Sequence, residues 1–166
     1  MNAFWSYFWP AFGAGLALGI IAGAIAYRRR RLRLIALAFG LAASILAAVV
    51  WHGPLGGADQ FTTKVRRGIK ATLVYYEMTQ VAADLHHDPL TRRVLLSGSA
   101  DDFQRSELVR LMEELPGVSS ASWSSDGRGM PLIVEGGCVS ILGFLIGLLL
   151  AYLVELRRRY NAQWDW

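Results

Sequence analysis

Three long runs without a charged residue constrain this chain more than any other feature. They cover residues 11–27, 34–51 and 136–154, which are 17, 18 and 19 residues long. At 1.5 Å per residue each helix would reach about 25–29 Å, close to the ~30 Å hydrocarbon core of a bilayer. Because three such runs in 166 residues leave too little polar chain to bury them, we expect three membrane-spanning helices.

Arginines that flank these runs predict how the chain crosses the membrane. Short arginine-rich loops stay in the cytoplasm, whereas loops longer than about 60 residues have little influence. We therefore expect the N-terminus and residues 52–135 on the periplasmic side of a bacterial inner membrane, and the C-terminus in the cytoplasm. We also expect the flanking arginines to contact anionic lipid headgroups. These are Arg28, Arg29, Arg30, Arg31, Arg33, Arg157, Arg158 and Arg159.

The first run differs from a cleaved signal peptide, because no basic residue precedes it and five arginines follow it. We expect it to remain in the mature protein. The predicted boundaries are residues 1–27 for the first segment and span, 28–33 for the arginine loop, 34–51 for the second span, 52–62 for a Gly-rich linker, 63–135 for a periplasmic domain, 136–156 for the third span and 157–166 for the tail.

The distribution of charge argues against a nucleic-acid partner. The net charge is +4, a balance that is common in nucleic-acid-binding proteins. Residues 52–135, however, carry nine basic and eleven acidic side chains, a net −2, and the rest of the chain carries +6. The excess of positive charge is therefore a topology signal, and we expect no nucleic acid as partner.

Small residues recur at steps of four in all three runs. Residues four apart share one helix face, and small ones there let two backbones approach closely in lipid. The pattern predicts close helix packing but leaves open whether the helices pack on one another or on another subunit. The two serines of the runs, Ser44 and Ser140, are expected to bond to their own helices. The predicted packing residues are Gly15, Gly19, Gly23, Gly40, Ser44, Gly143 and Gly147.

Residues 63–135 read as a small α+β domain. A helical pattern covers residues 63–87, with Val74, Met78, Val81 and Leu85 as its apolar stripe. Strands are expected at residues 91–97, 118–123 and 131–134. A second helix should begin after Asp101, where Gln104 completes a capping box, with Phe103, Leu108, Leu111, Met112 and Leu115 as its apolar face. The predicted fold class is therefore a membrane protein of three transmembrane helices with a small periplasmic α+β domain.

Part of this domain resembles the second half of a BON domain. In residues 85–123, Leu96-Ser97-Gly98 ends a strand and Gly117-Val118 opens the next one after a helix, as in that family. The resemblance implies a non-enzymatic periplasmic module that contacts phospholipid or other envelope proteins. One departure stands out, because the family places a strand and a turn before the Leu-Ser-Gly strand. Here we expect that hairpin to be missing or rebuilt, with residues 130–134 as a replacement strand.

Two groups of polar residues are candidate ligands. Asp84, His86, His87 and Asp88 would place metal-binding side chains near the end of the first predicted helix. His52 follows Ala48 by four residues, a spacing that resembles the pigment-ligating histidine of light-harvesting polypeptides. In both cases we favour the simpler interpretation, exposed polar residues and an interfacial histidine. We predict no metal and no cofactor other than bound lipid.

No nucleophile elbow, P-loop or dinucleotide fingerprint is present, so we predict that the protein is not an enzyme. The uncharged spans also argue against a pump or a proton-coupled carrier. The predicted function is a non-catalytic accessory or assembly subunit of a larger membrane complex, respiratory or photosynthetic among the options. Its partners would be other membrane subunits and anionic phospholipid. The alternatives are a stand-alone envelope protein whose domain binds phospholipid or cell wall, and a small homo-oligomeric channel or carrier.

Overall fold

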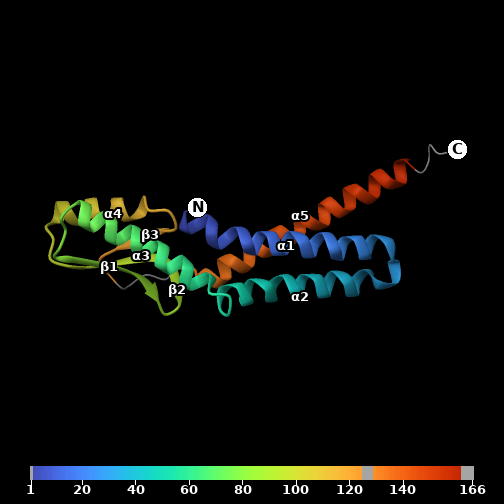
Figure 1. Cartoon of the computed structure of the whole chain (residues 1–166), viewed down its shortest axis with the longest axis horizontal. Helices are drawn as coiled ribbons and strands as arrows, with labels where there is room; N and C mark the ends of the chain where they lie inside the picture. The colour runs from blue at the N-terminus through green and yellow to red at the C-terminus, as the bar shows by residue number, and fades with distance from the viewer. Residues whose placement is uncertain (1, 125–128, 162–166) are drawn as a thin grey trace. The chain divides into compact units, whose positions relative to one another are not determined.

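A computed structural model of the chain describes residues 2–124 and 129–161 (Figure 1). Among these residues, three helices are long and apolar enough to cross a membrane, and they cover the three uncharged runs. The elements in chain order are α1 (Ala3–Arg28), the short 3-10 helix η1 (Arg30–Leu32), α2 (Arg33–His52), α3 (Gly57–Tyr75), β1 (Val81–His87), β2 (Leu90–Gly98), α4 (Asp102–Glu113), β3 (Ser120–Ser122) and α5 (Leu132–Asn161).

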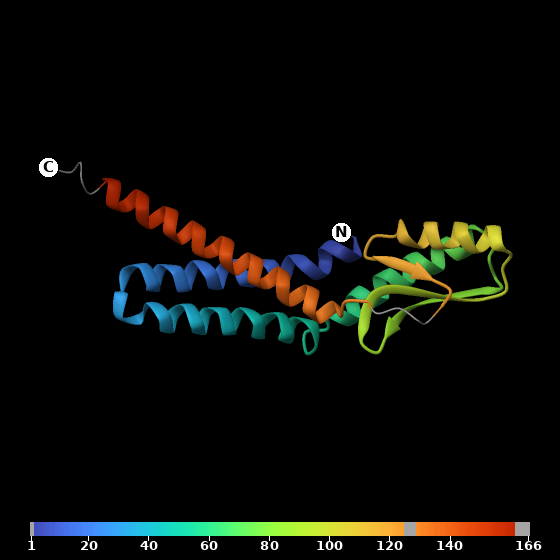
Figure 2. The same cartoon turned by 180° about the vertical axis from the view of Figure 1, so that it is seen from behind.

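The chain divides into two compact units. The sheet unit contains Met1–Tyr7 and Gly56–Glu135, and the helix unit contains Phe8–Leu55 and Gly136–Trp166. In the helix unit α1 and α2 form an antiparallel hairpin, and α5 crosses α1, as both views show (Figure 2). The sheet unit includes the first residues of the chain, whereas the sequence predicted a domain of residues 63–135 alone.

The helices of the helix unit continue beyond the uncharged runs. The arginine loop is largely η1, and α2 begins at Arg33. The predicted tail of residues 157–166 is helical as far as Asn161; the remaining five residues lie outside the described part of the chain. An ion pair of 3.0 Å joins Arg159 Nε to Glu155 Oε1 one turn earlier. Pairs at this spacing stabilise a helix.

The sheet unit has a three-stranded sheet in the order β1-β2-β3. β1 and β2 are antiparallel, whereas β2 and β3 are parallel. α3 contacts β1, and α4 contacts β3. The core between them is apolar and consists of Phe61, Val65, Ile69, Leu85, Val94, Leu96, Leu108 and Met112, each at most 3% exposed.

The predicted linker and first helix of this unit were wrong in their boundaries. α3 starts at Gly57, inside the predicted linker, and ends at Tyr75. Residues 81–87 are strand β1 rather than helix. Val81 and Leu85 are buried on one face, and a spacing of four puts two residues on the same face of a strand as well as of a helix. The apolar spacing alone therefore did not distinguish the two structures.

The second half of the unit follows the sequence more closely. β2 covers the strand predicted at residues 91–97, and the capping box is present: the Gln104 amide donates to Asp101 Oδ1 at 2.7 Å. β3 is shorter than predicted. The predicted strand at residues 131–134 was wrong, because α5 begins at Leu132 and only Pro131 forms a bridge, with Thr91. Phe103 was wrongly assigned to the buried face of α4, since it is 74% exposed.

The expected departure from the BON pattern does not occur. β1 and a turn at Asp88-Pro89 precede β2, which ends in Leu96-Ser97-Gly98. The hairpin that the sequence suggested to be missing is therefore present, and residues 130–134 do not replace it. Membership of that family stays a prediction.

Candidate functional site

Small residues of the helix unit lie where two helix backbones meet. A Cβ atom built on Gly15 or Gly19 of α1 would overlap the carbonyl oxygen of Ser140 or Phe144 of α5. In lipid, such small residues allow van der Waals contact between main chains, which is a main source of helix association. α1 and α5 therefore touch backbone to backbone along this line.

The same contact is formed from the α5 side. A Cβ on Gly143 or Gly147 would overlap the carbonyl oxygen of Phe12 or Leu16 of α1. Neither position accepts a side chain unless the two helices separate. The α1–α5 interface is thus lined by glycine on both helices.

Gly23 and Gly40 complete the packing of the three helices. A Cβ on Gly23 would lie 2.6 Å from Cβ of Ala151 on α5, and one on Gly40 of α2 would lie 2.6 Å from Cβ of Ala22 on α1. The sequence left open whether the small residues face this chain or another subunit. At all six glycines the nearest neighbour belongs to this chain.

Ser44 and Ser140 join α2 to α5. Both are 0% exposed. Ser140 Oγ donates to the Ser44 carbonyl at 2.9 Å, and the two hydroxyl oxygens are 2.8 Å apart. Ser44 Oγ in turn donates to the Ser140 carbonyl at 3.2 Å, so the two hydroxyls and the two carbonyls form one buried hydrogen-bonded group. The expectation that each serine bonds to its own helix was wrong. The two helices approach closely, which brings each hydroxyl within reach of the backbone of the other helix.

Two of the four candidate metal ligands, Asp84 and His87, contact an arginine. Arg66 of α3 binds the Asp84 carboxylate with two hydrogen bonds of 2.7 and 2.8 Å. Its Nη2 also lies 2.6 Å from His87 Nε2, and since guanidinium only donates, that histidine nitrogen accepts. The Arg66 guanidinium holds the pKa of the Asp84 carboxyl below its usual value.

The four candidate residues do not converge on one point as the ligands of a metal site would. They lie on β1 and its turn rather than at a helix end, so that part of the prediction was wrong. His86 Nδ1 faces the Pro89 carbonyl oxygen at 3.1 Å, and Asp88 lies in the turn. Within residues 2–124 and 129–161 no group of three His, Cys, Asp or Glu side chains is placed to hold a metal ion. His52, the weak candidate for pigment ligation, is the last residue of α2 and is half-buried; its interpretation as an interfacial histidine stays a prediction.

Arg92 connects four segments of the sheet unit. Its Nη1 pairs with Glu135 Oε2 at 2.9 Å, and its Nε donates to the Gly117 carbonyl at 3.0 Å. The guanidinium carbon lies 5.1 Å from the centre of the Phe4 ring. Both partners of the ion pair have side chains only 19% exposed, so the pair is partly protected from solvent screening. These contacts fasten the first turns of α1 and α5 to the sheet.

A second feature of the sheet unit is a group of exposed residues, which we call the aromatic end. We use this name for Val74, Tyr75, Tyr76 and Phe103. Tyr75 is 79% exposed, and its ring packs at 5.0 Å against that of Tyr76. The end of α3 and the start of α4, which carry these residues, lie at one end of the unit in both views (Figures 1 and 2). A shallow hollow of about 180 Å³ beside them is lined by residues 77–81, Ser99 and Gln104.

Sequence reasoning missed the aromatic end because it assigned Val74 and Phe103 to apolar helix faces. Val74 and Phe103 are 68% and 74% exposed.

Comparison with known protein families, curated proteins and solved structures finds no match for the chain. The arrangement of the chain's own residues therefore carries the functional argument.

Proposed function

We propose that this protein is a non-catalytic accessory subunit of a membrane complex. Its three helices anchor it in the bilayer, and its sheet unit docks on a partner through the aromatic end. Neighbouring membrane subunits and anionic phospholipid are the proposed partners.

The observation that carries this proposal is the closed packing of the helix unit. The glycines at the α1–α5 interface meet backbone, and the buried hydroxyls of Ser44 and Ser140 bond to each other. Ion and proton carriers need ionisable groups within the membrane, and the three uncharged runs supply none. This supports an anchor rather than a channel or carrier.

Lateral contacts with other subunits would use the outer helix faces, not the glycines. The outer face of α2 is apolar and exposed, with Leu34 at 80%, Phe39 at 74% and Leu46 at 62%. Such a face is compatible with lipid or with another transmembrane helix. We therefore propose α2 as the side of the bundle that meets neighbouring subunits.

The proposed orientation puts the sheet unit in the periplasm and both arginine clusters in the cytoplasm. Its support is the short arginine-rich connection between α1 and α2 and the arginines in the last turns of α5. The test is labelling with a membrane-impermeant thiol reagent of exposed Ser119→Cys in a Cys138→Ala background. Labelling in intact spheroplasts is expected. Labelling only after lysis would contradict the orientation.

The experiment that tests the function is purification in a gentle detergent followed by native mass measurement. An accessory subunit is expected in a stoichiometric complex with defined membrane proteins. Tyr75→Ser combined with Phe103→Ser should release the chain from the complex. Met130→Ser, a control at another exposed residue of the same unit, should not. A lone chain of 18.3 kDa with bound lipid would contradict the proposal. A symmetric ring of this chain alone would favour the channel.

A further inference from the structure

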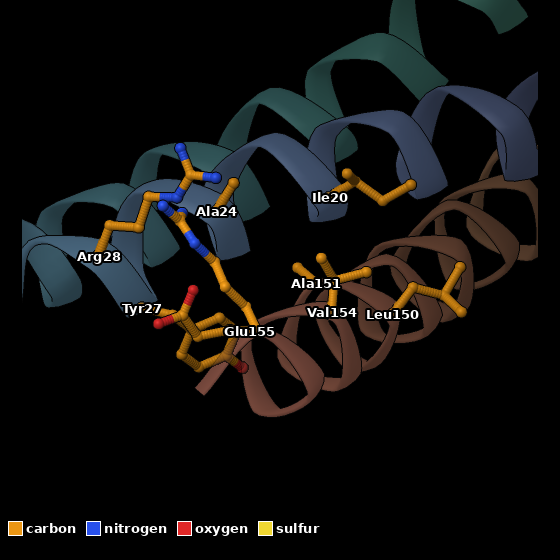
Figure 3. A pocket seen from close by; sticks show the side chains of 9 residues that line it. Ile20, Ala24, Tyr27, Arg28, Leu150, Ala151, Val154 and Glu155 are labelled. Atoms are coloured by element: carbon orange, nitrogen blue, oxygen red, sulfur yellow. The ribbon is translucent and has the colours of Figure 1, made fainter. Parts of the chain in front are cut away.

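The structure assigns to the helix unit a specific binding site for one anionic phospholipid, in a groove between α1 and α5. The groove has a volume of about 170 Å³. Ile20, Ala24, Leu150, Ala151 and Val154 line its apolar length, and Tyr27, Arg28, Glu155 and Arg158 line its polar mouth (Figure 3).

The two ends of the groove differ in the way that a phospholipid requires. In Figure 3, Ile20 and Leu150 lie at one end, and Tyr27, Arg28 and Glu155 lie at the other. Arg28 is the last residue of α1, and Arg158 lies three residues before the end of α5. At the end of a membrane-spanning helix these guanidinium groups reach the headgroup region, while the apolar length lies at the depth of acyl chains.

In the part of the chain that the structure describes, the two arginines at the mouth have no acidic side chain bonded to them. Among residues 2–124 and 129–161, neither Arg28 nor Arg158 has an ion pair or a side-chain hydrogen bond. Glu155, the acidic residue at the mouth, is bonded to Arg159 instead. Two guanidinium groups around one apolar groove therefore lack an anion, and a phosphodiester offers the planar oxygen acceptors that arginine binds.

A neighbouring hollow shows why this groove is the better site. It has a volume of about 240 Å³ and contains Arg33 and Arg159. There Arg159 is already paired with Glu155, and the rings of Tyr27 and Tyr152 pack at 5.7 Å. In that hollow Arg159 and the tyrosines already contact other groups of the protein. The Arg28–Arg158 groove, in contrast, combines an apolar length with two arginines that have no ion pair in the described part of the chain.

The test measures lipid binding to the full chain in detergent by native mass spectrometry. The probes are phosphatidylglycerol, phosphatidylcholine with the same acyl chains, and glycerol 3-phosphate. One retained phosphatidylglycerol per chain is expected, with weak retention of the other two. Equal retention of phosphatidylcholine, or equally strong binding of glycerol 3-phosphate alone, would overturn the assignment.

Paired variants separate a site from diffuse charge. R28Q combined with R158Q is expected to weaken phosphatidylglycerol binding about 30-fold, the effect of two lost headgroup contacts. R29Q combined with R157Q removes the same charge from adjacent residues outside the groove, and should weaken binding by less than about 3-fold because only screened attraction is lost. Equal losses in the two double variants would refute the site.

A third pair tests the apolar part with all charges intact. Ala24→Leu narrows the groove and is expected to reduce phosphatidylglycerol retention, whereas Ala17→Leu on the exposed side of the same helix should leave it unchanged. Unchanged retention in Ala24→Leu would contradict an acyl chain in the groove. Circular dichroism confirms that each variant is folded before binding is measured.

Discussion

Replacement of Gly15 by alanine tests the packing of the helix unit most sharply. A Cβ at this position would overlap the Ser140 carbonyl oxygen, well inside the 3.0 Å that real Cβ atoms keep from such atoms. The obstacle is backbone rather than a flexible side chain, so α1 and α5 have to separate. Gly13 lies two residues earlier on the same helix and has nothing within 4 Å of its would-be Cβ.

The expected cost follows from two terms. Overpacking of a tight interface costs about 1–3 kcal/mol. Separation of α5 from α1 also disturbs Ser140, whose bonds to Ser44 are worth about 0.6 kcal/mol on average in membranes. Alanine gains about 1 kcal/mol over glycine in a helix interior, and this gain applies to Gly13→Ala and Gly15→Ala alike. The two variants should therefore differ by about 2 kcal/mol, or about 30-fold in the ratio of folded to unfolded protein.

The assay is reversible unfolding in mixed micelles with increasing SDS, followed by far-ultraviolet circular dichroism. Gly13→Ala is expected to match or exceed the wild type, while Gly15→Ala unfolds at a lower SDS fraction. Gly137→Ala and Gly143→Ala repeat the comparison on α5, since Gly137 also has nothing within 4 Å. Equal stability of Gly13→Ala and Gly15→Ala would refute the reasoning, because it would mean that α1 does not touch α5 at Gly15.

Three further predictions concern the polar contacts. A double-mutant cycle of Ser44→Ala and Ser140→Ala should give a favourable coupling of about 0.6–1.7 kcal/mol in the same SDS assay; zero coupling would mean that the hydroxyls do not meet. Arg66→Gln should raise the pKa of Asp84, measured by carboxyl NMR titration. Because that pKa is lowered in the folded chain, the ion pair stabilises the fold at pH values above the ordinary aspartate pKa, and this contribution is lost as the pH falls through the folded pKa. Since both side chains are about half-exposed, the contribution is under about 1 kcal/mol. Glu135→Ala should destabilise the sheet unit by about 1–3 kcal/mol, measured by hydrogen exchange, because it removes the carboxylate partner of a partly buried arginine. Unchanged protection would argue against that ion pair.

The spans could be predicted because length and the absence of charge decide them. The arginines at the helix ends and the capping box at Asp101 are likewise local signals, and both lie where the sequence put them. β1 could not be predicted in this way, because the spacing of Val81 and Leu85 fits both a helix and a strand. What decides it is the antiparallel pairing of Leu85 with Val94, a contact between segments.

The partners of the small residues also needed three dimensions. A stripe of glycines predicts close approach but not the neighbour, and a serine in a helix has its own backbone as the default acceptor. Ser44 and Ser140 are 96 residues apart in the chain, so no local rule joins them. The same limit hid the role of the N-terminal residues, since Phe4 reaches Arg92 and Tyr7 donates to the Leu132 carbonyl at 3.4 Å.

The measurement that tests the proposed function most directly is site-specific photo-cross-linking in living cells. A benzophenone amino acid is placed at Tyr75 or Phe103 of the aromatic end, and at Met130 as an exposed control elsewhere in the sheet unit. The account predicts one discrete cross-linked product with a defined membrane protein from each of the first two positions and none from the control. Absence of cross-links at the aromatic end, or products formed only with further copies of this chain, would contradict a docking subunit.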